Sequence, residues 1–330
     1  MRYYKIELQK EDGTVLRPSS LGTAPLSSHL DSGHVNPGAL NIEFDIPVGI
    51  YSTASENQSY LRIWGLGLAD ISSAFDLNNA VIRIYGGMMK GLPLANPLQS
   101  GLIVSGQVFQ AFGNWIGTSQ TVDVILRPYA GSQATPGNFP LRWPTGTPLA
   151  NAIKYALDVG QAGVKKVIAI SPNLTLAHDE MGIYPSLDTF SAAVMRLSKT
   201  IIRNPNYTGV QIARNGDMIV VSDGTQAPTG EAKKIQFQDV IGQPTWIGPQ
   251  TIQFKTVLRS DIAINDYIEL PQTPVTQSAA SLPVFRDTKG KLTFNGIYRV
   301  QAIHHYGNFR QADAASWNTT FDVYPSQLQG

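Results

Sequence analysis

Two stretches of the chain indicate its fold, residues 101–128 and residues 296–325. The first reads GLIVSGQVFQAFGNWIGTSQTVDVILRP and the second reads GIYRVQAIHHYGNFRQADAASWNTTFDVYP. Each opens with glycine and an apolar residue and continues as a β-branched and aromatic strand. Each then carries an aromatic-Gly-Asn-aromatic motif, Phe112–Trp115 or Tyr306–Phe309, and ends in a strand with Asp-Val shortly before proline. We interpret the pair as an internal repeat whose unit is a β-hairpin with a Gly-Asn turn.

Strand patterns surround both copies of this repeat. The segments are β-branched or aromatic and are bounded by Gly, Pro, Asn or Ser. Before the first copy they are residues 2–8, 40–46, 60–64 and 80–85, and before the second they are residues 235–240, 250–258 and 267–270. Regular spacing with little helix between the strands predicts a β-sandwich or barrel around each copy.

The composition divides the chain into four parts. Residues 1–130 form the first β domain, in which residues 9–39 are a long polar loop or arm. A Gly- and Pro-containing linker over 131–146 follows, then a small α/β insert over 147–222, and finally the second β domain over 223–330. The predicted fold class is therefore mainly β with an α/β insert.

Helix and turn signals define the insert. Thr147 is suited to cap a first helix with Pro148 at its first position, and Ser186 is suited to cap a second helix. The stretch Arg214–Asp217 lies between two short apolar segments and carries Asn-Gly, which predicts a hairpin. We expect the two helices to cover a short sheet.

Overall charge and cysteine content exclude several classes of function. The 330 residues include 25 Lys and Arg against 24 Asp and Glu, a net charge of +1 that lacks the basic surplus of a nucleic-acid binder. The absence of cysteine excludes disulfides, thiolate metal sites and cysteine nucleophiles. No stretch is apolar enough for a membrane span, and Met1–Leu8 lacks the apolar core of a signal peptide, which predicts folding in a cytoplasm.

No motif in the sequence marks a reaction or a cofactor. The stretch Gly65–Asp70 matches half of a dinucleotide fingerprint, but Asp70 stands at the third glycine position, and we interpret it as a bend at a sheet corner. His304 and His305 are neighbours in a strand and point to opposite faces, so they cannot share an ion. We expect the histidines to lie on surfaces or interfaces. The sequence therefore predicts no catalytic, cofactor-binding or metal-binding residue, although carboxylates that meet only in space escape such a search.

Aromatic residues are the candidate contact residues. Trp246 sits in a loop with turn residues on both sides, a position that suits an interface anchor or a tryptophan folded onto its own domain. The aromatics of the two repeated motifs, Phe112, Trp115, Tyr306 and Phe309, complete the set of candidate interface residues.

The chain resembles the baseplate hub proteins of contractile-tailed bacteriophages, which are related to the hub half of type VI secretion spike proteins. The resemblance is carried by residues 237–254, by Asp266–Pro271, by the ending over residues 296–323, and by the order of β domain, α/β insert and β domain. It implies two tail-tube-like β-barrel or sandwich domains in one chain. The hub fold of this family is not known for catalytic residues, so the resemblance implies that the protein is not an enzyme and has no cofactor.

The resemblance also implies a role and partners. Three chains would form a pseudo-sixfold ring that joins the sixfold tail tube to the threefold central spike and lets DNA pass without specific binding. The chain would form a homotrimer. Its partners would be the central spike protein, the tail tube or tube-initiator protein, and a tape measure protein. The protein would be a virion component of the tail baseplate, assembled in the host cytoplasm.

Two other functions remain open at this point. One is a phage or cell-surface module that binds a receptor or glycan, for which exposed aromatics would form the platform. The other is a wall-degrading enzyme with a carboxylate pair. Neither accounts for the repeat or for the insert.

Overall fold

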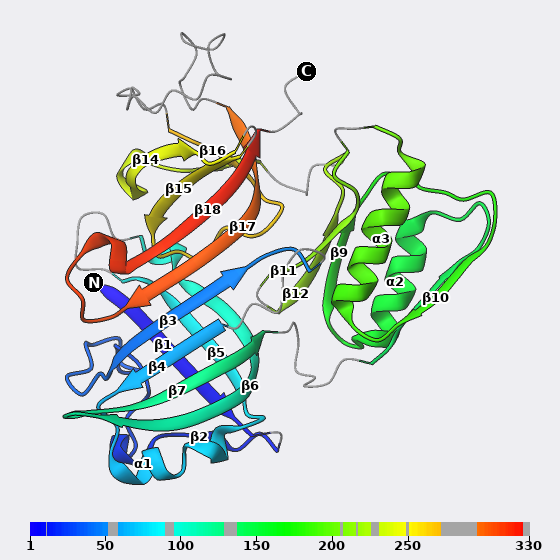
Figure 1. The fold of residues 1–330 in the computed structure, drawn as a ribbon. Coiled ribbons are helices and arrows are strands. Elements are labelled where there is room, and N and C mark those ends of the chain that lie inside the picture. The colour runs from blue at the N-terminus through cyan, green and yellow to red at the C-terminus, as the bar shows by residue number, and fades with distance from the viewer. Residues whose placement is uncertain are drawn as a thin grey trace.

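The structure is a computed structural model that describes residues 1–10, 12–51, 59–89, 96–128, 137–204, 207–215, 217–225, 231–248, 251–271 and 296–325. Most of the described strands form one large, mainly antiparallel sheet, and two helices lie to one side of it in a separate α/β module (Figure 1). The predicted fold class, mainly β with an α/β insert, is confirmed.

The first half of the sheet contains seven strands that occur before residue 129. They are β1 (Arg2–Gln9), β2 (Val15–Leu16), β3 (Asn41–Val48), β4 (Ser59–Trp64), β5 (Val81–Met88), β6 (Gly101–Ile116) and β7 (Ser119–Pro128). Their spatial order is β3-β4-β7-β6-β5-β1-β2, and every pair is antiparallel. Helix α1 (Leu68–Ser72) packs against β6 and β7.

The second half of the sheet is built by strands after residue 232. They are β13 (Lys233–Lys234), β14 (Val240–Trp246), β15 (Ile252–Val257), β16 (Tyr267–Glu269), β17 (Ile297–Asn308) and β18 (Trp317–Pro325). Their spatial order is β14-β15-β18-β17, with β16 on the other edge of β17 and β13 paired to β16. Strand β17 also pairs with β3, which joins the two halves into one sheet of 13 strands.

The two halves share one strand order. In the first, five antiparallel strands lie as β3-β4-β7-β6-β5, and in the second, five antiparallel strands lie as β14-β15-β18-β17-β16. The two lists match strand for strand in chain order, so the predicted repeat is confirmed at the level of topology. We call these two sets of five strands unit 1 and unit 2.

The predicted Gly-Asn turns are wrong. Gly113 and Gly307 lie inside β6 and β17, and the first hairpin turns at Gly117, which has a φ of 61°. The Asp-Val pairs are also not equivalent, because Asp123 lies opposite Phe112 whereas Asp322 lies opposite Ala302. Glycine serves close packing here: a Cβ at Gly113 would lie 2.3 Å from Ile71 Cγ2, and one at Gly307 would lie 2.3 Å from Phe44 Cζ.

Gly113→Ala tests this packing role. The new methyl group would also lie 2.5 Å from the backbone oxygen of Ile71, so α1 must shift away from the sheet. We expect the free energy of unfolding to fall by about 1–3 kcal/mol, measured by urea denaturation. Gly67→Ala is the matched control, because its Cβ would meet nothing closer than Ser20 Cβ at 3.7 Å. Equal stability of the two variants would contradict the explanation.

Within the described residues, the strands do not close into barrels. The path of paired strands runs from β14 at one end to β2 at the other. The physical reason is that the edge of β17 beyond β16 is used by β3 of the other unit. Each unit still curves around an apolar core, one including Tyr4, Phe44 and Val124, the other including Phe254, Val300 and Phe321.

The insert has its own core and two small sheets. Its elements are β8 (Phe139–Trp143), α2 (Leu149–Gly160), β9 (Lys165–Ala169), β10 (Glu180–Tyr184), α3 (Leu187–Ile201), β11 (Gln211–Asn215) and β12 (Met218–Ser222). The sheets are β10-β8 and β11-β12-β9. Strand β8 lies inside the segment predicted as a linker over 131–146, and the predicted hairpin is confirmed by the pairing of Asn215 with Met218.

The two helix starts in the insert differ from each other. Ser186 caps α3 as predicted, through a capping box with Thr189. The predicted cap at Thr147 is wrong: Pro148 is the N-cap of α2, and the Thr147 hydroxyl donates to the carbonyl of Pro144 instead.

The described residues of the predicted arm, 9–39, fold back onto their own unit. The amide of Ile6 donates to the carbonyl of Leu26, and the amide of Ser28 donates to the carbonyl of Tyr4. Asp70 receives hydrogen bonds from the amides of Ser19 and Ser20. That carboxylate therefore anchors the arm to the start of α1. It belongs to the stretch Gly65–Asp70, which was predicted to be a bend.

Candidate assembly interface

The junction between the two units is a six-residue antiparallel ladder. It runs from Ile303 opposite Val48 to Asn308 opposite Glu43. The amide of Phe309 extends it by donating to the carbonyl of Ile42. A strand edge of one unit thus covers a strand edge of the other.

Side chains from unit 2 enter the core of unit 1 at this junction. Trp317 of β18 is 3 % exposed and belongs to the same apolar cluster as Phe44. The two rings meet edge to face with their centroids 5.3 Å apart. The indole N–H donates to the carbonyl of Gly87 on β5 at 3.0 Å. The guanidinium of Arg2 lies 5.7 Å from the indole ring centre and donates to the carbonyl of Asn308 at 2.7 Å.

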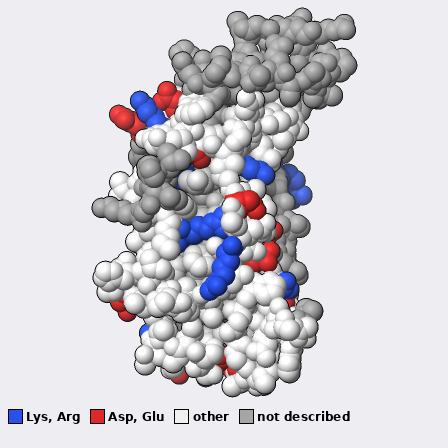
Figure 2. Space-filling model, turned by 90° about the vertical axis from the view of Figure 1, so that its left-hand side faces the viewer, with Lys and Arg blue, Asp and Glu red and all other residues white. Residues whose placement is uncertain are grey.

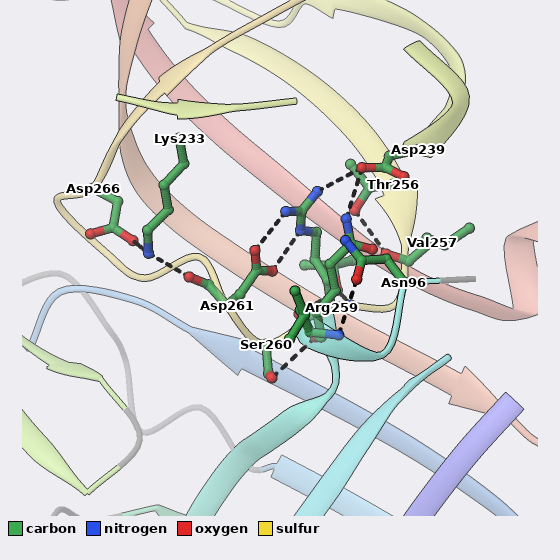
Figure 3. Close-up of polar contacts among 12 residues, drawn as sticks. Asn96, Lys233, Asp239, Thr256, Val257, Arg259, Ser260, Asp261 and Asp266 are labelled. Carbon is green, nitrogen blue, oxygen red and sulfur yellow. Dashed lines mark hydrogen bonds and ion pairs between the residues drawn. The ribbon is translucent and has the colours of Figure 1, made fainter. Parts of the chain in front are cut away.

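A buried arginine forms a second tie between the units (Figure 3). Arg259 follows β15 and is 3 % exposed. Its guanidinium lies 3.2 Å from Asp239 Oδ2 and forms two bonds of 2.7 Å with the carboxylate of Asp261. The tie reaches unit 1 because Gln99, from the loop between β5 and β6, donates to Asp239 at 2.9 Å. Ser260 donates its amide to the Gln99 carbonyl, also at 2.9 Å.

The insert is attached to both units by two arginines. Arg299 of β17 donates to Asn265 at 2.6 Å and to Ser222 of β12 at 3.2 Å. Arg214 of β11 is 5 % exposed and donates to the carbonyl of Ser105 on β6 at 3.2 Å. The insert is therefore held at the point where the two units meet.

The candidate interface residues lie in different environments. Trp115 is 64 % exposed near the end of β6, while Phe112 is half-buried on the same strand. Tyr306 is half-buried and donates to Glu43 of β3 at 3.3 Å. Phe309 packs on Tyr4 with ring centroids 4.9 Å apart. Trp246 ends β14 and packs against the core of unit 2. That these residues contact a partner stays a prediction.

Two histidines depart from the surface role expected for them. His29 is 8 % exposed, and His305 is 4 % exposed, with Nδ1 2.9 Å from the hydroxyl of Thr319. His304 points to the opposite face, as predicted, where it lies 2.6 Å from Asp45. Burial, with smaller contributions from His304 and Arg214, lowers the pKa of His305 to about 3. This burial could not be predicted from the sequence, because either face of β17 could be the inner one.

The low pKa of His305 predicts a loss of stability in mild acid. The folded protein keeps this ring neutral, whereas the unfolded chain binds a proton near pH 6.5. Stability is therefore complete above that pH and falls as the pH drops toward the folded pKa. Between about pH 7.5 and about pH 5 we expect this group to cost about 2 kcal/mol of unfolding free energy.

Urea unfolding at a series of pH values measures this loss. The pH dependence should be weaker by that amount in His305→Gln, whatever the variant's stability at neutral pH. His178→Gln is the control, because His178 is exposed on the insert. An unchanged slope in His305→Gln would contradict the assignment.

In the described part of the chain, no group of three or more His, Asp or Glu side chains could hold a metal ion. No helix there is long and apolar enough to cross a membrane.

No family model matches this sequence, and no curated protein matches it either. Solved structures do match it over nearly its whole length. Two of these structures are tail proteins. A tail protein from Neisseria meningitidis is 8 % identical, with 98 % of this chain and 96 % of that chain covered and a TM-score of 0.47. The 43 kDa tail protein of prophage MuSo2 from Shewanella oneidensis is 8 % identical, with 98 % of each chain covered and a TM-score of 0.49.

A third similar structure is the half-lidded PdpA-VgrG complex of Francisella. It is 7 % identical, with 98 % of this chain and 58 % of that chain covered and a TM-score of 0.47. The resemblance stated from the sequence is likewise to proteins of phage tails.

Proposed function

We propose that this chain is a structural hub at the tip of a phage tail, in which three copies form a ring of six similar units. The observation that carries the proposal is the repeat of one five-stranded topology in a single chain, with the two copies joined edge to edge by β17 and β3. A chain with two equivalent units turns threefold symmetry into pseudo-sixfold symmetry without a second protein.

The proposed partners follow from the two symmetries. The sixfold side of the ring would meet the tail tube or a tube-initiator protein, with a tape measure protein in contact, and the threefold side would meet the central spike. DNA would pass through the lumen, and the protein would be a baseplate component of the virion, assembled in the host cytoplasm. We assign it no reaction.

The surface supports a role with extensive contacts. Figure 2 shows one face of the molecule, on which charged residues gather near the middle while wide areas are uncharged. The exposed large apolar side chains include Trp115, Phe75, Leu98 and Phe237. Where exposed apolar side chains gather into a contiguous patch, the surface is typical of one that another protein covers.

Electron microscopy of the purified protein, with its mass in solution, tests the proposal. The expected result is a particle of three chains with a central hole and six similar lobes. The measurement is repeated with the candidate spike protein, because some rings assemble only on a partner. A monomer under both conditions would contradict the hub and favour the receptor- or glycan-binding module.

A further inference from the structure

The two strands that meet at the junction, β17 and β3, each have an equivalent strand in the other unit. These two equivalent strands do not pair with each other within the chain. Inside the chain, residues 303–308 of β17 pair with β3. The strand equivalent to β17 in unit 1 is β6, and the strand equivalent to β3 in unit 2 is β14. Figure 1 shows β14 at the top of the molecule and the β6–β7 hairpin in its lower part. The same contact can therefore be made once more, between the β6 of one copy and the β14 of the next.

The far half of β6 pairs with β7 on one edge and with no described strand on the other. Strand β5 pairs with β6 only as far as Gln107. Beyond it, the amide of Ala111 points away from β7 and donates to the side chain of Asn78 at 2.8 Å. The alternation of the ladder turns the backbone of Gly113 and Trp115 to the same edge. Residues 109–116, FQAFGNWI, carry no charge on this edge, whereas edge strands that must stay single are usually protected by charges.

The two copies of the aromatic-Gly-Asn-aromatic motif differ in how deeply their fourth residue is buried. Phe309, the fourth residue of the second motif, is partly buried and packs against the core of unit 1. Trp115, the fourth residue of the first motif, is 64 % exposed. Leu68, one helical turn before the Ile71 that contacts Gly113, is 55 % exposed. An apolar contact that exists within the chain thus has an exposed equivalent on β6.

Strand β14 has the complementary features. It is the last strand on the path of the sheet, its sequence VIGQPTW is uncharged, and it contains Pro244, which is tolerated at sheet edges. Phe237, three residues before it, is 68 % exposed, and Ile247, directly after it, is 52 % exposed. At the opposite end of the path, β2 is only two residues long, which makes a poor edge for pairing.

We propose that copies of this chain join head to tail, with the far half of β6 running antiparallel to β14 and to the residues just before β14 in the neighbouring copy. This inference rests on the proposed ring and names the surfaces that close it. The register between copies follows from residues that lie opposite one another across the neighbouring strands of each unit. The row Phe44–Leu61–Val124–Ala111 in unit 1 matches the row Val240–Thr256–Thr319–His305 in unit 2.

The internal pairs then predict the pairs between copies. Within the chain, Gly307 lies opposite Phe44 and Tyr306 lies opposite Asp45. The matching pairs are Gly113 with Val240 and Phe112 with Ile241 of the neighbouring copy. In this register, Trp115 comes beside Gln238 and the exposed ring of Phe237.

Disulfide trapping tests the register directly, because the chain contains no cysteine. Residues directly opposite each other lie within disulfide distance. Oxidised Phe112→Cys/Ile241→Cys protein should give covalent dimers and trimers on a denaturing gel, and each single variant should not. The control is Met181→Cys/Ile241→Cys, because Met181 is 72 % exposed on the insert, away from both edges. Circular dichroism of the reduced proteins checks that each variant folds.

A second measurement does not depend on the exact register. Trp115→Asp and Phe237→Asp should each raise the concentration at which the ring dissociates by about tenfold or more, with the thermal melting point of the free chain unchanged. Met181→Asp should leave the ring intact. A ring of three chains that resists both substitutions and gives no trapped pair would overturn the inference and leave the proposed function standing. The absence of any ring, with and without spike, would overturn both.

Discussion

Arg259→Met should lower the free energy of unfolding by about 3–5 kcal/mol, because it leaves the carboxylate of Asp239 buried without its cation. Both side chains are almost fully buried, 4 % and 3 % exposed. The methionine keeps the apolar stem of the arginine but none of its donors. Urea unfolding, followed by circular dichroism and by tryptophan fluorescence, measures the loss.

A surface ion pair provides the control for Arg259. Lys234 lies 4.0 Å from Glu269, and its side chain is 82 % exposed. Lys234→Met should change the unfolding free energy by less than about 1 kcal/mol. The double variant Arg259→Met/Asp239→Asn should recover part of the loss, because it removes the unpaired charge. A loss of the same size in the Arg259 and Lys234 variants would show that the tie in Figure 3 contributes no more than a surface pair.

Local signals in the sequence predicted local structure well. The strand expected at residues 2–8 is β1, the cap expected at Ser186 is present, and the hairpin after Arg214 joins β11 and β12. Each depends on residues only a few positions apart. The existence of a repeat was also predicted, from two similar strand sequences, but its strand order was not.

The features that the sequence could not give depend on distant contacts. A Gly-Asn pair between aromatics favours a turn, but the same glycine is also required where another segment packs closely on a strand. Only the approach of Ile71 and Phe44 to Gly113 and Gly307 distinguishes the two cases. The pairing of β17 with β3 was hidden for another reason: strand edges present backbone groups, which every sequence shares.

The two ties between the units, Arg259 and Trp317, have different structural roles. Arg259 holds the loop between β5 and β6 next to the segment that leads into β14. In the proposed ring, it would therefore set how the edge of unit 2 is presented to the neighbouring copy. Trp317 fixes the angle of the internal junction, which a closed ring must repeat at every contact. Loss of either tie should disturb the ring before it unfolds the units.

Trp317→Ala should be as damaging as the loss of Arg259, about 3–5 kcal/mol of unfolding free energy. The substitution opens a cavity between Phe44 and Phe309 and leaves the carbonyl of Gly87 without its indole donor. Because this side chain belongs to unit 2 but lies in the core of unit 1, the two units should also cease to unfold together. Denaturation followed by circular dichroism and by fluorescence should then give separate midpoints.

Two further tryptophan variants separate packing from other effects of the substitution. Trp317→Phe keeps an aromatic ring against Phe44 but cannot donate to Gly87, so most of the lost stability should return, short of about 1 kcal/mol. Trp115→Ala removes the same side chain from an exposed site and should change the stability of the free chain by less than about 0.5 kcal/mol. A small effect of Trp317→Ala would mean that the units are held by the β17–β3 ladder alone. In that case the angle between units would be set by backbone pairing, and any ring would inherit its curvature from the twist of the sheet.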